Sequence, residues 1–194
     1  DASSPYGYPA PLVTSGAPEA WVTRAIGALT EHLRESGVIS LFLRFHPLIG
    51  LGPVAFEPFG TIVEQGTTVS IPLGDDVQQM RARMRASHRY EIKRSLREGQ
   101  VAECDTQWES FDEFIEIYRE TMDRLDAQES YYFTPDYFER LRDELGDHVF
   151  LWRVRIDGVV AAVALITECG GTVQYHLSGT RGEFLRSHPT KVLL

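Results

Sequence analysis

The chain has 194 residues, of which 43% are hydrophobic, and a formal net charge of −9 at pH 7. A chain of this composition can bury a sizeable core, which excludes disorder over most of its length, and it fits one large domain or two small ones. The acidic balance excludes general affinity for nucleic acids or membranes, so any anion-binding site has to be local.

The sequence indicates no membrane span, because its longest apolar runs fall far short of the roughly 20 residues that cross a bilayer. We therefore expect a cytoplasmic protein. Cys104 and Cys169 lie in no CxxC pair and have no histidine at ligand spacing, so we expect structural thiols and no metal site. The chain begins with Asp1 and stops at Leu194 inside an apparent helix start, which indicates a fragment of a longer protein.

The first half opens with a loop rich in Pro, Gly, Ser and Tyr over residues 1–16. Ala, Leu and Ile at helical spacing then predict a helix over residues 18–36, which Gly37 ends. Apolar, β-branched segments predict strands, the last two joined by a turn at Gln65-Gly66. These strands are residues 38–45, 60–64 and 67–73.

A basic segment follows, and residues 75–99 read as a helix whose N-cap comes from Gly74-Asp75-Asp76. Seven of the 19 Lys and Arg residues lie between positions 81 and 97. Two rows have a spacing of four. The cationic row is Arg81, Arg85, Arg89, Lys93 and Arg97, and the apolar row is Met80, Met84, His88, Ile92 and Leu96.

In one continuous helix the apolar row would pack against the protein while the cationic row faced an anionic partner. A solvated face paired with acids from elsewhere is the other interpretation, and a second helix starting at Ser87 would interrupt both rows. His88 lies on the apolar row, where a buried structural histidine is favoured over a catalytic one.

The second half has the order of an α+β fold. A short strand at residues 101–104 precedes two helices, one with apolar residues from Phe111 to Met122 and one at residues 135–145, with a polar loop at 126–133 between them. Turns at Asp157-Gly158 and Gly170-Gly171 then separate three strands of an antiparallel meander. These strands are residues 149–156, 159–168 and 172–178, and a further helix follows them.

Several short motifs resemble those of one family. They are Phe114-x-x-x-Tyr118-x-x-Thr121-x-x-Arg124, the strand Tyr175-His176-Leu177-Ser178-Gly179-Thr180, the segment from Arg89 through Ile92, Lys93 and Arg94 to Gly99, and the loop Ser4-Pro5-Tyr6-Gly7-Tyr8-Pro9-Ala10-Pro11. Together they resemble the GNAT-fold acyltransferases of the FemAB-like group. The resemblance implies a mixed, mostly antiparallel sheet flanked by helices, in parts of two tandem GNAT-like lobes. Residues 1–105, with the basic helix 75–99, would form the later part of the first lobe, and residues 106–194 the earlier part of the second.

The resemblance also implies transfer of an acyl or aminoacyl group onto an amine. The best-studied members of the group use aminoacyl-tRNA to extend the peptide of a peptidoglycan precursor, which makes such a precursor the expected acceptor and tRNA a possible partner. The donor, aminoacyl-tRNA or acyl-CoA, would be a co-substrate, with no tightly bound cofactor. An acyl-CoA-dependent N-acetyltransferase and a non-catalytic binding module on the same fold are the alternatives, and the oligomeric state stays open.

Ordinary GNAT enzymes hold the pyrophosphate of coenzyme A at a Gly-rich turn that opens a helix. The corresponding stretch, residues 179–186, has two glycines but no Gly-x-Gly, and it places Glu183 beside Gly182. This departure favours a donor other than an acyl-CoA.

Transfer to an amine requires removal of a proton and stabilisation of an oxyanion. Tyr175, His176 and Ser178 are the best polar candidates for catalysis. Strand alternation would direct Tyr175 and Leu177 to one face and His176 and Ser178 to the other. Packing of Tyr175 in the core, with His176 on a solvated face, is the other interpretation.

The candidate substrate-binding residues lie on three segments. Arg124 could hold a phosphate or carboxylate with two hydrogen bonds, or form a surface ion pair, and the resemblance adds Tyr118 on the same helix. Tyr6 and Tyr8 could line a sugar or peptide pocket, or clamp the loop. On the basic helix, the family-matched positions are Arg89 and Arg94, which we expect to meet a phosphate-bearing donor or acceptor.

Overall fold

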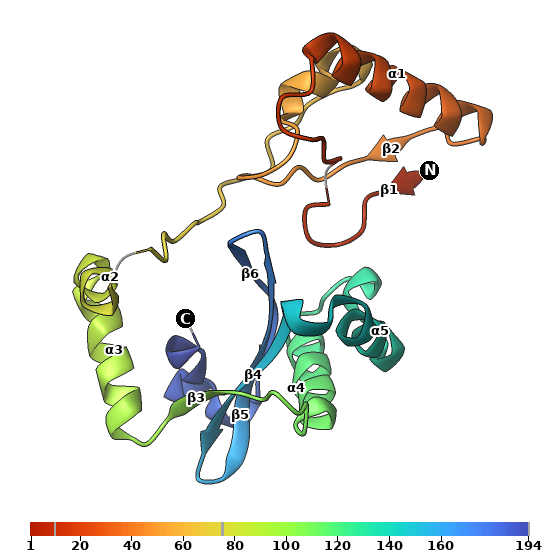
Figure 1. Ribbon diagram of the computed structural model, residues 1–194. Helices are drawn as coiled ribbons and strands as arrows, with labels where there is room; N and C mark the ends of the chain where they lie inside the picture. The colour runs from red at the N-terminus through yellow and green to blue at the C-terminus, as the bar shows by residue number, and fades with distance from the viewer. Residues whose placement is uncertain (10, 75, 194) are drawn as a thin grey trace. The chain divides into compact units, whose positions relative to one another are not determined.

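The computed structural model describes residues 1–9, 11–74 and 76–193. It divides into two compact units, Asp1–Pro72 and Leu73–Leu194. Figure 1 gives the order of the elements along the chain. The predictions that involve Ala10, Asp75 and Leu194 lie outside the described residues.

The first unit is built around a helix that the sequence predicted. α1 (Glu19–Glu35) packs on a 3₁₀ helix, η1 (Pro53–Phe59). Val22, Ile26 and Phe56 are buried between them. A two-residue parallel pair, β1 (Ala2–Ser3) with β2 (Leu41–Phe42), ties the start of the chain to this unit.

The strands predicted for the first unit are mostly wrong. The strand expected at residues 38–45 shrinks to β2, and residues 60–64 and 67–73 form no strand. Val63 and Val69 are 63% and 88% exposed, so the β-branched residues that suggested strands have no surface to pack on. An isolated hairpin is marginal in water without such a surface.

The basic segment forms two helices, α2 (Val77–Arg83) and α3 (Ala86–Arg97). Asp76 caps α2 by accepting a hydrogen bond from the Gln78 N–H at 2.6 Å, as the sequence predicted. The backbone is extended at Met84 and Arg85, with ψ of 149° and 144°. The two rows spaced by four therefore do not run along one helix.

The apolar row is still less exposed than the cationic row, because all its members except Leu96 are half-buried. Ser95 is the buried residue of α3, whereas Leu96 from the predicted apolar row is 47% exposed. Arg89 donates hydrogen bonds from Nη1 to the carbonyl groups of Arg81, Ala82 and Met84 at the end of α2. Arg89 thus holds the corner between the two helices.

The second unit contains the predicted α+β fold. Its sheet consists of β3 (Val101–Cys104), β4 (Val149–Ile156), β5 (Val159–Cys169) and β6 (Thr172–Thr180), paired antiparallel in that order. The strand at 101–104 and the three-stranded meander are confirmed. The sheet is flanked by helices, which is the fold class that the sequence predicted.

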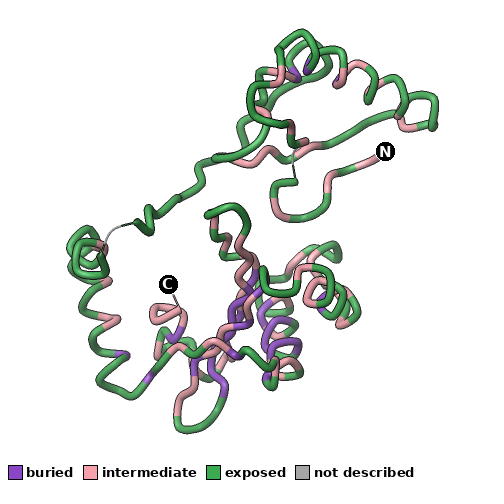
Figure 2. Tube along the Cα trace, viewed as in Figure 1, coloured by how far each residue is buried: buried purple, intermediate pink, exposed green. Residues whose placement is uncertain are grey.

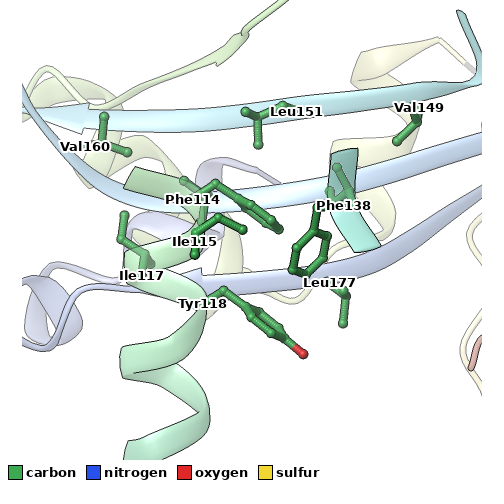
Figure 3. Close-up of a cluster of buried hydrophobic side chains, with 11 residues drawn as sticks. Phe114, Ile115, Ile117, Tyr118, Phe138, Val149, Leu151, Val160 and Leu177 are labelled. Atoms are coloured by element: carbon green, nitrogen blue, oxygen red, sulfur yellow. The ribbon is translucent and has the colours of Figure 1, made fainter. Parts of the chain in front are cut away.

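Two helices cover one face of this sheet, α4 (Phe111–Arg124) and α5 (Pro135–Leu145) (Figure 1). Figure 2 shows the buried residues gathered along the sheet and α4, and Figure 3 shows the side chains between them. Rings of Phe114 and Phe138 meet edge to face with centroids 4.9 Å apart. The other buried members of this core are Ile115, Ile117, Tyr118, Val149, Leu151, Val160, Val163, Leu165 and Leu177.

The start of α4 is fixed by the buried carboxylate of Asp105. It accepts hydrogen bonds from the backbone N–H groups of Ser110 at 2.7 Å and Glu109 at 3.2 Å. Arg153 on β4 donates to the same carboxylate at 3.0 Å and to the Ser110 hydroxyl at 2.6 Å. This cluster anchors the helix that carries much of the candidate site.

The expected helix after the meander is present only as short 3₁₀ turns in the described residues, η4 (Gly182–Ser187) and η5 (Pro189–Val192). His188 separates them in the left-handed conformation, with φ of 50°. η5 and α3 lie on the side of the sheet opposite α4 (Figure 1), joined by an ion pair of 2.8 Å between Lys191 and Glu91. The remaining 3₁₀ turns are η2 (Glu129–Tyr131) and η3 (Gly146–His148).

Candidate functional site

A β-bulge in β6 decides how the predicted catalytic residues are arranged. Leu177 pairs with Leu165 on β5, but the next pair is Tyr175 with Ile166, so His176 is the extra residue. An extra residue reverses the alternation of side chains between the two faces. The prediction that Tyr175 shares a face with Leu177 is therefore wrong.

Tyr175 and Ser178 lie together on the face away from α4. Partial burial raises the pKa of the Tyr175 phenol, and the nearby Ser178 side chain offsets this effect only in part. Tyr175 stays 37% exposed, so at neutral pH it presents a protonated hydroxyl that can donate a hydrogen bond to a ligand.

His176 lies on the helix-covered side, near Tyr137 of α5. The Tyr137 hydroxyl and His176 Nε2 are 3.5 Å apart, and the Tyr137 ring stacks on Phe133 with centroids 4.4 Å apart. Burial lowers the pKa of His176, because the imidazolium is poorly solvated there. A neutral imidazole at physiological pH can accept a proton.

The turn after β6 is held tightly against α4. A Cβ on Gly179 would lie 2.9 Å from both the carbonyl oxygen and Cγ2 of Ile117, so β6 approaches α4 closely only because this residue is glycine. The Gly182 N–H donates to Glu120 Oε1 at 2.6 Å. Arg181 donates to Glu116 Oε2 at 3.2 Å. Two carboxylates of α4, those of Glu116 and Glu120, thus accept hydrogen bonds from residues of this turn.

Arg124 and Thr121 complete this contact. Arg124 donates from Nη1 to the Thr180 carbonyl and from Nη2 to Thr121 Oγ1, both at 3.2 Å. Thr121 Oγ1 in turn accepts from the Thr180 N–H at 3.2 Å. Arg124 also lies 3.9 Å from Glu120 Oε1, so the predicted ligand-binding arginine sits at the turn and is held there by protein groups.

The three predicted tyrosines differ in position. Tyr118 is buried, and its hydroxyl donates to the Tyr131 carbonyl, an arrangement that favours a structural role. Tyr6 and Tyr8 are 37% and 39% exposed on the opening loop of the first unit. Tyr8 has φ of 68° and contacts His46 edge to face. Their predicted role in binding stays a prediction.

Arg94, the second predicted arginine of α3, makes an ion pair of 2.7 Å with Glu98. It also lines a groove between α3 and residues 186–188 at the end of η4, which we call the α3 groove. Its volume is about 400 Å³. Arg89 is not among the residues that line it.

Sequence reasoning missed Glu116, Glu120 and Tyr137. The two glutamates lie four and eight residues before Arg124, a spacing that places all three on one side of α4 and could have been noticed. Nothing in the sequence marks Tyr137, because its proximity to His176 depends on how α5 packs on the sheet.

Two comparisons with known proteins bear on identity. No curated protein matches the chain. A family model described as "Acetyltransferase (GNAT) domain" matches residues 82–194, which is more than half of the chain and includes α3, the sheet, α4, α5 and the turn after β6. The chain therefore belongs to the GNAT acetyltransferase family, whose chemistry is acyl transfer to an amine.

Proposed function

We propose that this GNAT domain transfers an aminoacyl group from aminoacyl-tRNA to the amine of a peptidoglycan precursor peptide. Membership of the family supports acyl transfer to an amine. The tRNA donor and the peptidoglycan acceptor are the parts that we propose. The support for the acceptor is the resemblance of the segments around Tyr118, Arg124 and Arg89 to FemAB-like motifs, although in the structure these side chains bond to protein groups.

The choice of donor rests on the turn after β6, where Glu120 accepts a hydrogen bond from the backbone. A GNAT enzyme that uses acyl-CoA needs free backbone N–H groups there for the pyrophosphate. In this chain the Gly182 N–H already donates to the carboxylate of Glu120, whereas Glu116 forms an ion pair with Arg181. Bringing a pyrophosphate to this position would place like charges together, which favours a donor that is held elsewhere.

The residues of β6 supply the two functions that the transfer needs. His176, neutral because burial lowers its pKa, would take the proton of the attacking amine. The protonated hydroxyl of Tyr175 would donate to the oxyanion. The new C–N bond forms as the ester C–O bond to the tRNA ribose breaks, and the ribose oxygen leaves with a proton. Because the bulge separates these side chains, the reacting group would lie at the outer edge of β6, where both faces are reachable.

An acyl-CoA-dependent N-acetyltransferase is the second candidate. The matching family model supports it, since that model describes acetyltransferases. Arg124 Nη1 lies 3.9 Å from Glu120 Oε1, so a small rotation of Glu120 toward Arg124 would release the Gly182 N–H for a phosphate.

Isothermal titration calorimetry separates these donors. Titration of the full chain with coenzyme A, aminoacyl-tRNA and a UDP-linked muropeptide should show binding of the last two and little binding of coenzyme A. Glu120→Ala should increase the affinity for coenzyme A, since it frees the turn. Glu139→Gln removes an exposed acid on α5 and serves as the control for net charge. Tight coenzyme A binding by the wild-type chain would overturn the proposed donor.

A further inference from the structure

The α3 groove has room for a small ligand, and its lining is mostly polar and charged. One wall is a side of α3, with Ser87, Tyr90 and Arg94. The other is the end of η4, with Arg186 and Ser187, together with His188. Its volume of about 400 Å³ lies within the range of small-molecule sites, roughly 300–1,000 Å³.

The charged side chains that line the α3 groove are two glutamates and two arginines, and Lys191, from outside the lining, adds a further cation. Glu91 pairs with Lys191 at 2.8 Å and Glu98 pairs with Arg94 at 2.7 Å, so both glutamates are neutralised. In the described part of the chain, Arg186 makes no ion pair or side-chain hydrogen bond. An unneutralised guanidinium in a groove attracts an anion and can hold it with two hydrogen bonds.

The wall that carries Arg186 is held in place. The buried amide of Gln100 donates from Nε2 to the Ser187 carbonyl at 3.2 Å. His188 next to it keeps a left-handed backbone, which costs energy in a residue other than glycine and occurs often at functional positions. Ser87, Tyr90 and Ser187 add hydroxyl groups around the groove.

We propose that the α3 groove binds a small ligand through a phosphate or carboxylate group. Arg186 makes the ionic contact, and the hydroxyls around the groove hydrogen-bond the rest of the ligand. The first turn of α3, which has no side-chain cap, reaches the groove at Ala86 and adds backbone donors. This site is separate from the residues of β6, and it stands whether or not the proposed donor is right.

Calorimetric titration of the full chain with inorganic pyrophosphate and with malonate tests the site. We expect saturable binding of at least one probe. Tighter binding of pyrophosphate would identify the ligand group as a phosphate, and tighter binding of malonate would identify it as a carboxylate. Arg186→Gln should weaken it about tenfold, because it removes a charge-assisted hydrogen bond. Arg97→Gln is the matched control, since Arg97 is an exposed cation of α3 outside the groove, and it should change binding little.

Two results would overturn the proposal. One is that neither probe binds. The other is that Arg97→Gln weakens binding as much as Arg186→Gln, which would mean general attraction to the basic helices. A measurement on the wild-type chain guards against misfolding of the variant: pyrophosphate or malonate should shift the NMR amide signals of Ser87 and Ser187, and unshifted signals would also contradict the site.

Discussion

At the scale of single residues, Asp105 is a buried carboxylate whose negative charge binds the start of α4 and Arg153. Its burial would raise its pKa, but the N–H groups of Ser110 and Glu109 and the charge of Arg153 together hold the pKa below its usual value. Asp105→Asn should lower the free energy of unfolding by about 2–3 kcal/mol, because it leaves Arg153 without its buried partner. Urea unfolding at neutral pH measures the loss.

The pH dependence of stability gives Asp105 a second test. A carboxyl whose pKa is depressed in the folded state stabilises above the unfolded pKa, and this contribution is lost as pH falls through the folded value. The gap between wild type and Asp105→Asn should therefore narrow on acidification below the usual range of aspartate. A gap that is constant with pH would show that the charge contributes nothing.

The pKa of His176 is also lowered, in this case by burial, which disfavours the charged imidazolium. Titration by NMR should give a value below that of an ordinary histidine, with the signal assigned by its loss in His176→Asn. Protonation of His176 is less favourable in the folded state than in the unfolded state. The contribution of His176 to the free energy of unfolding should therefore be fully present above its unfolded pKa and decrease as the pH falls below that value. An ordinary or raised pKa would remove His176 as the neutral base of the transfer.

At the scale of elements, the contact between β6 and α4 depends on Gly179. Gly179→Ala would place a Cβ against the Ile117 backbone, so it should destabilise by about 1–3 kcal/mol through overpacking. Gly60→Ala is the control, because no atom lies within 4 Å of the added Cβ and the backbone there is extended. Equal thermal stability of the two variants would show that the close approach is not required.

The elements also show what could be predicted from the sequence. The helix 111–124 and the strands around Asp157-Gly158 and Gly170-Gly171 are local patterns with a clear period, and they are confirmed. The bulge at His176 breaks the assumption of strict alternation, so no count of positions along β6 could reveal it. The contact of Glu120 with Gly182 joins residues 62 apart and depends on packing.

The single continuous helix predicted for the basic segment is wrong, and the alternative, a second helix that starts near Ser87, agrees with the start of α3 at Ala86. Residues 77–97 have helical spacing throughout, but the carbonyl groups at the end of α2 are satisfied by the Arg89 guanidinium instead of by a continuing helix. Side-chain capping of this kind leaves little trace in periodicity. Because the Arg89 guanidinium binds these carbonyl groups, it is not free to bind a ligand as the predicted cationic row required.

At the scale of the whole molecule, an acidic chain concentrates exposed cations on α2 and α3. Arg81, Arg85 and Lys93 are exposed, and within the described residues no ion pair involves them. If these helices contact tRNA, replacing all three by Gln should weaken binding and reduce the slope of log K against log salt by roughly 2–3. Filter binding across a salt series measures it, and an unchanged slope would exclude these helices as the tRNA contact.

The transfer itself is tested most directly by mass spectrometry of the acceptor. The full chain, incubated with a UDP-linked muropeptide and either aminoacyl-tRNA or acetyl-CoA, should add the mass of one aminoacyl residue from the tRNA donor, and His176→Asn should abolish this gain. An acetyl gain from acetyl-CoA, with none from aminoacyl-tRNA, would contradict the account and restore the turn after β6 as a coenzyme A site.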